Sequence, residues 1–134
     1  MLNYQHHTIP PTKYTPNVEW RISEEGISLL LAGSTEMENV VEWYEPVFTW
    51  LEHALTQTFR DIPFRLTLAL NYVNTSSSKM LLELLDRLRE EYEGTERSVY
   101  AEYIVEVGDE DIADAACELF SEWKSDHFTI GWKN

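Results

Sequence analysis

A run of hydroxyl side chains stands where an apolar stretch of the chain gives way to a helical pattern. The run is Asn74-Thr75-Ser76-Ser77-Ser78-Lys79, and it follows an apolar stretch at residues 64–73. Hydroxyls at the start of a helix lie beside backbone N–H groups that have no partner inside the helix. Such a position suits a bound anion, and it equally suits a hydroxyl that is to be phosphorylated.

The simplest role of this run is to cap the helix. One hydroxyl, from Thr75 or Ser76, is sufficient for that and contributes about 1 kcal/mol. Four hydroxyls between an asparagine and a lysine exceed what a cap needs. Phosphorylation would add about 1.5 to 2 negative charges, which the helix N-terminus and Lys79 can accept but a docking partner cannot bury cheaply. A cap, an anion site and a phosphorylation switch all remain open from these residues.

Residues for catalysis or metal binding are dispersed along the chain. The four histidines show no telling spacing to Cys117, and the glycines form neither a P-loop nor a dinucleotide fingerprint. We therefore expect a protein that is not an enzyme and that has no metal and no cofactor. Cys117 lies in an apolar helical segment and is expected to be a buried core thiol.

Composition and charge limit the classes of molecule that this protein can bind. The 134 residues fit one domain, and a hydrophobic fraction of 43% is typical of a globular chain. A formal net charge of −14 argues against nucleic acid and against anionic membranes, and it favours partners with basic surfaces. Neither a membrane-spanning run nor a secretory leader is present, so we expect a cytoplasmic protein.

Periodicity predicts a layered α/β fold. Residues 1–13 are expected to be a poorly ordered lead-in, and residues 14–134 a single domain. The expected strands are 18–22, 27–32, 64–73, 98–107 and 128–130, and the expected helices are 40–55, 76–93 and 112–123. This order predicts a mixed central sheet of about five strands with about three helices. The hydroxyl run then follows the carboxyl end of a strand, where function is usually found in such folds.

Four details of these elements can be checked against a structure. Pro46 falls inside the first helix, which we expect to be continuous or slightly broken. Ser34 or Thr35 is expected to cap that helix. Alternation along the strand 64–73 places Tyr72 on the same face as Phe64. The aromatic side chains of the first helix favour core packing over an exposed partner patch.

The hydroxyl run and two other blocks resemble one family. Tyr72-Val73-Asn74-Thr75-Ser76-Ser77-Ser78-Lys79 resembles the Y-x-N-T-S-S-x-K signature of the SiaC family of bacterial regulatory phosphoproteins. Tyr14-Thr15-Pro16-Asn17-Val18 resembles its N-terminal segment. The loop from Gly33 to Asn39, with the aromatic and proline positions beyond it, resembles a third block, from which this chain differs at Ser34, Glu36 and Met37.

This resemblance implies a STAS-like fold, similar to that of anti-sigma-factor antagonists, and a function in signalling. It implies that Thr75 is the phosphoacceptor, that a partner kinase adds the phosphate and that a PP2C-type phosphatase removes it. It also implies that the unmodified protein binds and activates a diguanylate cyclase, and so influences cyclic-di-GMP output and biofilm formation or aggregation.

The remaining residues of the site have roles in this hypothesis. The expected supporting residues of the phosphosite are Asn74, Ser76, Ser77 and Lys79, and the expected partner-binding residues are Glu38, Asn39 and Ser78. The competing hypothesis is a module that binds a small molecule or anion at residues 74–78 without covalent modification.

Overall fold

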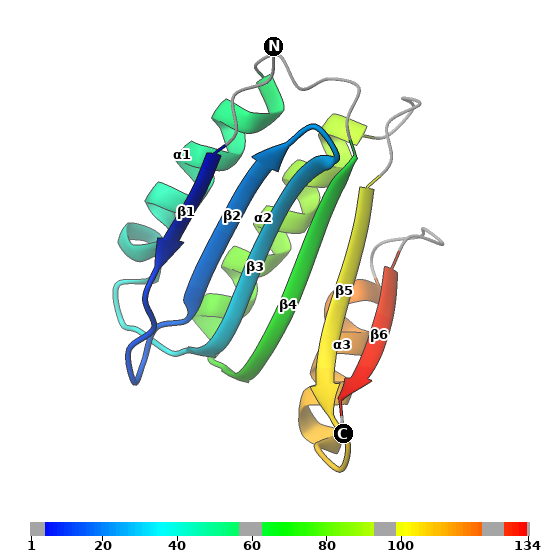
Figure 1. The fold of residues 1–134 in the computed structure, drawn as a ribbon. Helices are drawn as coiled ribbons and strands as arrows, with labels where there is room; N and C mark the ends of the chain where they lie inside the picture. Colours follow the sequence, from blue (N-terminus) through cyan, green and yellow to red (C-terminus); the bar gives the residue numbers. More distant parts are fainter. Residues whose placement is uncertain (1–4, 57–62, 93–98, 122–127, 134) are drawn as a thin grey trace.

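The fold is a single mixed sheet with helices on one side (Figure 1). The computed structural model describes residues 5–56, 63–92, 99–121 and 128–133. Along the chain, the elements are β1 (Gln5–Ile9), β2 (Asn17–Ser23), β3 (Gly26–Thr35), α1 (Val40–Thr56), β4 (Phe64–Val73), α2 (Thr75–Tyr92), β5 (Val99–Glu106), α3 (Glu110–Ser121) and β6 (Phe128–Lys133). The predicted α/β class and the mixed sheet are confirmed.

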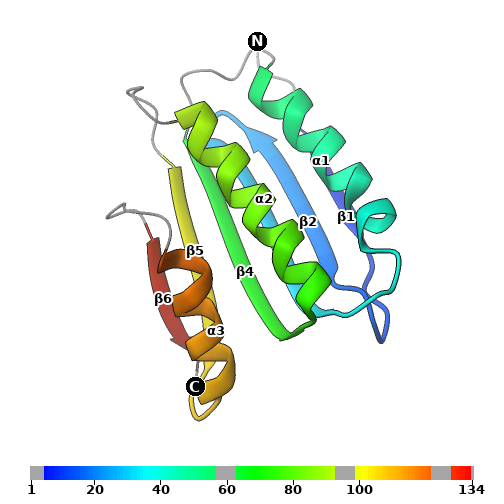
Figure 2. The same ribbon diagram turned by 180° about the vertical axis from the view of Figure 1, so that it is seen from behind.

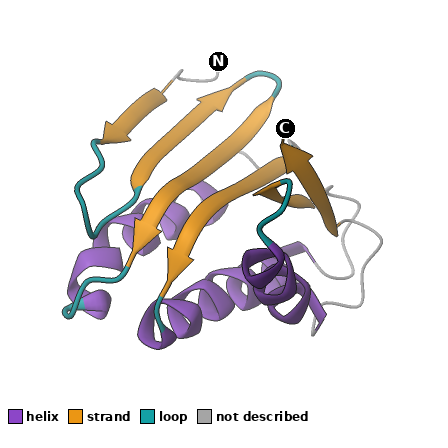
Figure 3. Cartoon of the chain, turned by 90° about the horizontal axis from the view of Figure 1, so that it is seen from below, coloured by secondary structure: helices purple, strands orange, loops and turns teal. Residues whose placement is uncertain are grey.

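The strands lie in the sheet in the order of the sequence, from β1 to β6. The first three strands form an antiparallel meander, whereas β3, β4, β5 and β6 run parallel and are joined by crossover helices. All three helices cover the same face of the sheet (Figures 2 and 3). The parallel connections bring the carboxyl ends of β3, β4 and β5 to one edge, where the helices begin.

The core lies between the sheet and this helical layer. Inward positions of β4 are buried at every second residue from Phe64 to Leu70, and α2 buries the stripe that its apolar spacing predicted. The stripe consists of Met80, Leu81, Leu84, Leu85 and Leu88. The opposite face of the sheet carries half-buried and exposed residues, because no described helix packs on it. Among the described residues, no helix has the length and apolar character needed to cross a membrane.

Strand β1 corrects the expectation of a poorly ordered lead-in. Residues 5–9 pair with β2 in antiparallel register, with His7 opposite Trp20. The two rings lie 5.7 Å apart between centroids, and His6 Nε2 lies 2.9 Å from Glu19 Oε1 on the other face. Residues 5–9 have no apolar alternation of their own, so the strand depends on backbone pairing with β2, which local sequence does not reveal.

Helix α1 is continuous through Pro46, as favoured from the sequence. Pro46 is exposed, so the ring and the missing hydrogen bond face solvent and not the core. Tyr44 and Trp50 are buried, and Trp50 stacks on Trp20 of β2 at 5.2 Å between ring centroids. Core packing is therefore confirmed for these two aromatic residues.

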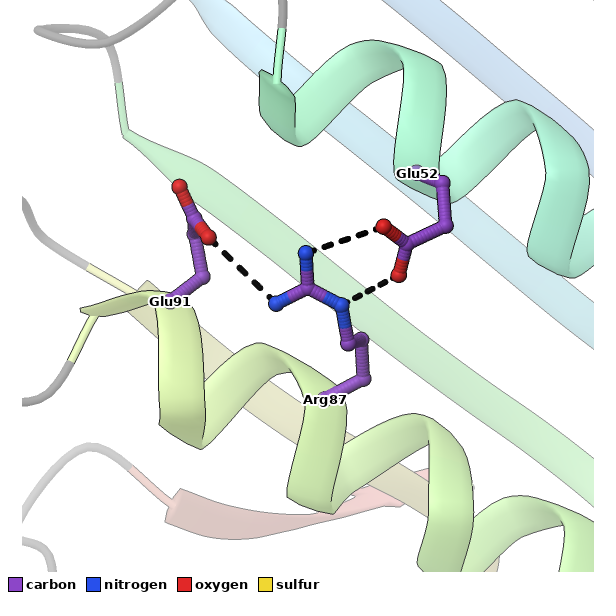
Figure 4. Close-up of polar contacts among 3 residues, drawn as sticks. All are labelled: Glu52, Arg87 and Glu91. Carbon is purple, nitrogen blue, oxygen red and sulfur yellow. Dashed lines mark hydrogen bonds and ion pairs between the residues drawn. The ribbon is translucent and has the colours of Figure 1, made fainter.

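An ion-pair cluster joins α1 to α2 (Figure 4). The Arg87 guanidinium contacts both carboxylate oxygens of Glu52 on α1, and its Nη2–Oε2 distance is 3.0 Å. Its Nη1 also lies 3.3 Å from Glu91 Oε2, one turn further along α2. Hydrogen bonding to Arg87 lowers the pKa of Glu52, and the same bond raises the pKa of Arg87. The cluster fixes the two helices side by side above the sheet.

Two further expectations need correction. Cys117 is exposed, because α3 turns Ala113 and Ala116 toward the core and leaves Cys117 on the solvent side. Tyr72 does not share the burial of Phe64 and has 52% of its surface exposed. The register between β3 and β4 shifts after Gly33, where Asn71 has no partner on β3, and this irregularity interrupts the alternation just before Tyr72.

Candidate functional site

The hydroxyl run lies at the carboxyl edge of the parallel strands, as predicted. Strand β4 ends at Val73 and α2 begins at Thr75, so Asn74 is the single residue between them. The Asn74 side chain caps the helix: its Oδ1 accepts a hydrogen bond from the Ser77 N–H at 2.9 Å. Its backbone carbonyl accepts from the Ser78 N–H at 2.9 Å. The cap is therefore the asparagine and not a hydroxyl of Thr75 or Ser76.

The four hydroxyl residues occupy different environments. Thr75 and Ser76 are exposed, Ser77 is completely buried and Ser78 is half-buried. Lys79 is exposed and lies four residues after Thr75, on the same side of the helix. Because the cap role belongs to Asn74, the Thr75 hydroxyl is free of that structural task. Thr75 meets the steric condition for a phosphoacceptor, and the buried Ser77 does not.

A buried chain of hydroxyls anchors the start of α2 to β3 and α1. The Thr35 hydroxyl at the end of β3 donates to Ser77 Oγ at 2.8 Å, and it lies 2.8 Å from the Tyr44 hydroxyl of α1. Ser77 Oγ in turn lies 3.8 Å from the Met37 sulfur. The Asn74 N–H donates to the Thr35 carbonyl at 3.1 Å. These bonds fix the position of Thr75 relative to the neighbouring loop.

Burial keeps Tyr44, the titratable hydroxyl of this chain, in its neutral form. Burial raises the pKa of Tyr44 from 10.0 to about 12, although the hydrogen bond with Thr35 acts in the opposite direction. With its proton retained, Tyr44 can donate to Thr35, which then donates to Ser77. Each hydroxyl of the chain thus has a partner, as buried polar groups require.

The loop between β3 and α1 borders both the hydroxyl run and a surface groove. Asn74 Nδ2 lies 3.5 Å from the Met37 carbonyl, and the Glu36 N–H donates to the Tyr14 carbonyl at 3.0 Å. Glu38 and Asn39 are exposed beside the groove. Asn39 precedes α1, and its carbonyl accepts the Trp43 N–H at 3.0 Å. Thr35, expected as a possible cap of this helix, instead lies in the buried chain.

The structure adds three residues that the sequence reasoning did not assign to the site: Thr35, Met37 and Tyr44. The sequence does contain a feature that could have assigned Thr35 to the site, because Thr35 is a hydroxyl residue at the end of the strand next to β4 in the sheet. Carboxyl ends of neighbouring parallel strands meet at one edge, so Thr35 and the run at residues 74–79 had to lie near each other. The contacts of Met37 and Tyr44 depend on how α1 packs, which spacing alone does not give.

The described residues contain no group of three or more His, Cys, Asp or Glu side chains that could hold a metal ion. What the site does present is an exposed threonine hydroxyl at a helix N-terminus, held by buried hydrogen bonds. This arrangement can accept a phosphate and can present a changed surface to another protein.

The mixed sheet and the hydroxyl run at the start of α2 place the chain among α/β domains that carry a candidate site at the N-terminus of a helix. Residues 9–131 match the model of the family described as SiaC family regulatory phosphoprotein. The chain therefore belongs to the SiaC family, and the family resemblance noted from the hydroxyl run is confirmed.

Related proteins support this assignment. An uncharacterized protein of Pseudomonas aeruginosa strain UCBPP-PA14 is 35% identical over 88 residues, and the match spans 64% of this chain and 65% of that protein. The solved structure of SiaC of Pseudomonas aeruginosa has a TM-score of 0.81 at 29% identity, covering 96% of this chain and 99% of that one.

A second solved structure shows a SiaC protein with a partner. It is the crystal structure of diguanylate cyclase SiaD in complex with its activator SiaC from Pseudomonas aeruginosa. The matching chain has a TM-score of 0.83 and 31% identity, with coverage of 95% of this chain and 99% of that one. The SiaC protein in that complex is thus the activator of a cyclase.

Proposed function

We propose that this protein is a phosphorylation switch without enzymatic activity of its own, and that it binds and controls a diguanylate cyclase. In this proposal, a kinase phosphorylates Thr75 and a PP2C-type phosphatase removes the phosphate. The observation that carries it is the division of the hydroxyl run: Thr75 is exposed at the first helical position, while Ser77 is buried and anchored. The complex of a related SiaC protein with a diguanylate cyclase supports the choice of partner class.

The local structure can accept a phosphate on Thr75 without unfolding. The dianion would lie at the N-terminus of an 18-residue helix, where the helix dipole and free N–H groups favour negative charge. Lys79, one turn further along, would offset part of that charge. These interactions contribute about 1 kcal/mol in favour of the phosphorylated helix.

Phosphorylation of Thr75 would affect the binding of a partner differently from the folding of the protein. A protein that covers Thr75 in its unmodified form would have to desolvate a dianion after phosphorylation, which costs several kcal/mol unless it supplies cations there. Phosphorylation is therefore expected to change partner binding much more than folding. Glu38, Asn39 and Ser78 are proposed to belong to the same partner surface, because they lie on the loop and helix start that flank Asn74.

The test is the replacement Thr75→Ala, with Ser76→Ala as the matched control. Both side chains are exposed neighbours, so both variants should fold like the parent protein. A cognate kinase from the same host should add one phosphate to the parent and to Ser76→Ala, and none to Thr75→Ala. Intact mass followed by peptide mapping of residues 74–79 measures this directly.

Unchanged labelling of Thr75→Ala would refute the assignment of the acceptor. Native protein that carries a co-purifying small molecule and no phosphorylated fraction would favour the alternative of a binding module at residues 74–78. The partner is tested by the rate of cyclic-di-GMP synthesis of the host's cyclase: unmodified protein should change that rate, and Thr75→Glu should abolish the change.

A further inference from the structure

A groove lies beside the proposed phosphosite, between the segment that precedes β2 and the start of α1. Tyr14 and Trp43 form aromatic walls, and the loop residue Met37 contributes to the apolar lining. Tyr14 has 50% of its surface exposed, so its ring is accessible from solvent. The groove is therefore a surface with apolar area available for contact.

Carboxylates surround this apolar lining. Glu36, Glu38 and Glu42 all line the groove. Within residues 5–56, 63–92, 99–121 and 128–133, none of the three carboxylates forms an ion pair. In contrast, Glu52, which lies in α1 like Glu42, is paired with Arg87. The groove thus combines apolar walls with negative charge that the described fold does not neutralise.

A cation of the chain itself already lies at one aromatic wall. The Lys13 ammonium lies 5.3 Å from the centroid of the Tyr14 ring, within the range of a cation–π contact. Lys13 occupies this ring and does not pair with the three glutamates. A partner with complementary charge would therefore place its own cations next to the three carboxylates and next to Trp43.

We infer that this groove binds a partner segment in which Arg or Lys side chains flank an apolar or aromatic anchor. The anchor would cover Met37 and the aromatic walls, and the cations would pair with Glu36, Glu38 and Glu42. Arg suits the position best, because its planar guanidinium can stack on an indole and bind a carboxylate at the same time. The chain's net charge of −14 would also speed the approach of such a segment.

This inference rests on the proposed function, since it states the chemistry by which the partner is held. The loop from Glu36 to Asn39 separates the groove from Asn74, so one partner can cover the groove and Thr75 together. The groove would then provide affinity through charge and apolar contact, and Thr75 would decide whether the adjoining surface can be covered.

The probe for the test is the peptide acetyl-Arg-Leu-Trp-Arg-Lys-amide, with acetyl-Glu-Leu-Trp-Glu-Glu-amide as its charge-reversed counterpart. Each is titrated into the ¹⁵N-labelled full chain at low salt. The groove variant is Glu36→Gln, Glu38→Gln, Glu42→Gln. The control Glu83→Gln, Glu90→Gln, Asp114→Asn removes the same charge from exposed positions on α2 and α3.

The basic peptide should shift the amide resonances of residues 12–15 and 36–43, and the acidic peptide should not. Its affinity should fall roughly tenfold in the groove variant, which corresponds to about 1.4 kcal/mol, and much less in the control. Shifts spread over the helix faces, or equal losses in the two variants, would overturn the inference. No kinase enters this experiment, so a failure of Thr75 phosphorylation is detected separately and leaves its outcome unaffected.

Discussion

Ser76 and Ser77 are adjacent hydroxyls with opposite surroundings, which makes them a sensitive test of the site. Ser77 is fully buried and bonded to Thr35, whereas Ser76 is exposed. Replacing Ser77 with Ala leaves the Thr35 hydroxyl without its acceptor, so the free energy of unfolding should fall by about 1–2 kcal/mol. Ser76→Ala should stay within about 0.5 kcal/mol of the parent protein. Urea denaturation followed by fluorescence measures both.

Equal effects of the two replacements would contradict the buried hydroxyl chain.

The sequence predicted a site at residues 74–79 because four hydroxyls exceed what a cap needs. It could not assign different roles to Ser76 and Ser77, since both are the same residue type at a helix start. Their difference arises from Thr35 and Tyr44, which are distant in the sequence and approach only when β3 and α1 pack against α2.

At the scale of elements, the contact between α1 and α2 depends partly on Arg87. Its side chain is 23% exposed and binds Glu52, which is 48% exposed, so solvent weakens the pair. Arg87→Ala should lower the free energy of unfolding by about 1 kcal/mol, helped by the bidentate geometry. Arg87→Lys should recover only part of this loss, because an ammonium cannot reproduce the planar fork.

The matched control is Arg89→Ala. Arg89 pairs with Asp86 within the same helix, and both side chains are about half exposed. This replacement should change stability by only a few tenths of a kcal/mol. Urea denaturation at low and high salt checks both variants, and the Arg87 effect should shrink as salt increases. Similar losses for both variants would show that the bridge between the helices adds nothing.

The elements themselves could be predicted where their own residues carry the signal. The stripe of α2 and the alternation of β4 are local patterns, and the structure confirms the stripe throughout and the alternation from Phe64 to Leu70. Strand β1 could not be predicted, because its polar residues are ordered by pairing with β2. The exposure of Cys117 was also missed, since a short helix with alanines on its inner face packs only a narrow stripe against the sheet.

At the scale of the whole molecule, the described helices cover one face of the sheet and leave the other open (Figures 2 and 3). Two buried tyrosines, Tyr44 of α1 and Tyr103 of β5, lie between the sheet and the helical layer. Tyr44 is bonded to Thr35, and Tyr103 of β5 donates its hydroxyl to the Leu70 carbonyl at 3.2 Å. Leu68 and Tyr103 are the last paired residues of β4 and β5, so this bond connects Tyr103 to a part of β4 beyond the paired register. Burial raises the pKa of both tyrosines, so both resist ionisation in the folded protein.

These raised pKa values predict how the protein unfolds in alkali. The pKa of Tyr44 is 10.0 in the unfolded chain and about 12 in the folded protein. The contribution of the neutral hydroxyl is therefore complete below pH 10 and is lost as the pH rises toward 12. Between pH 10 and pH 11, the free energy of unfolding should fall by about 1 kcal/mol from this residue. Tyr103, whose pKa is also raised, should likewise lower the free energy of unfolding as the pH rises.

The measurement is urea denaturation of the parent protein and of Tyr44→Phe at closely spaced pH values from 8 to 11. Phenylalanine cannot ionise, so the variant should be less stable at pH 8, where it lacks the bond to Thr35, and should lose less stability as the pH rises. Tyr103→Phe should flatten the curve in the same way. Tyr72→Phe is the control for loss of a tyrosine hydroxyl, because 52% of the Tyr72 surface is in solvent and the replacement leaves both buried hydroxyls in place. Parallel curves for Tyr44→Phe and Tyr103→Phe would mean that neither buried hydroxyl holds its proton more strongly in the folded protein than in the unfolded chain, which would contradict the raised pKa values.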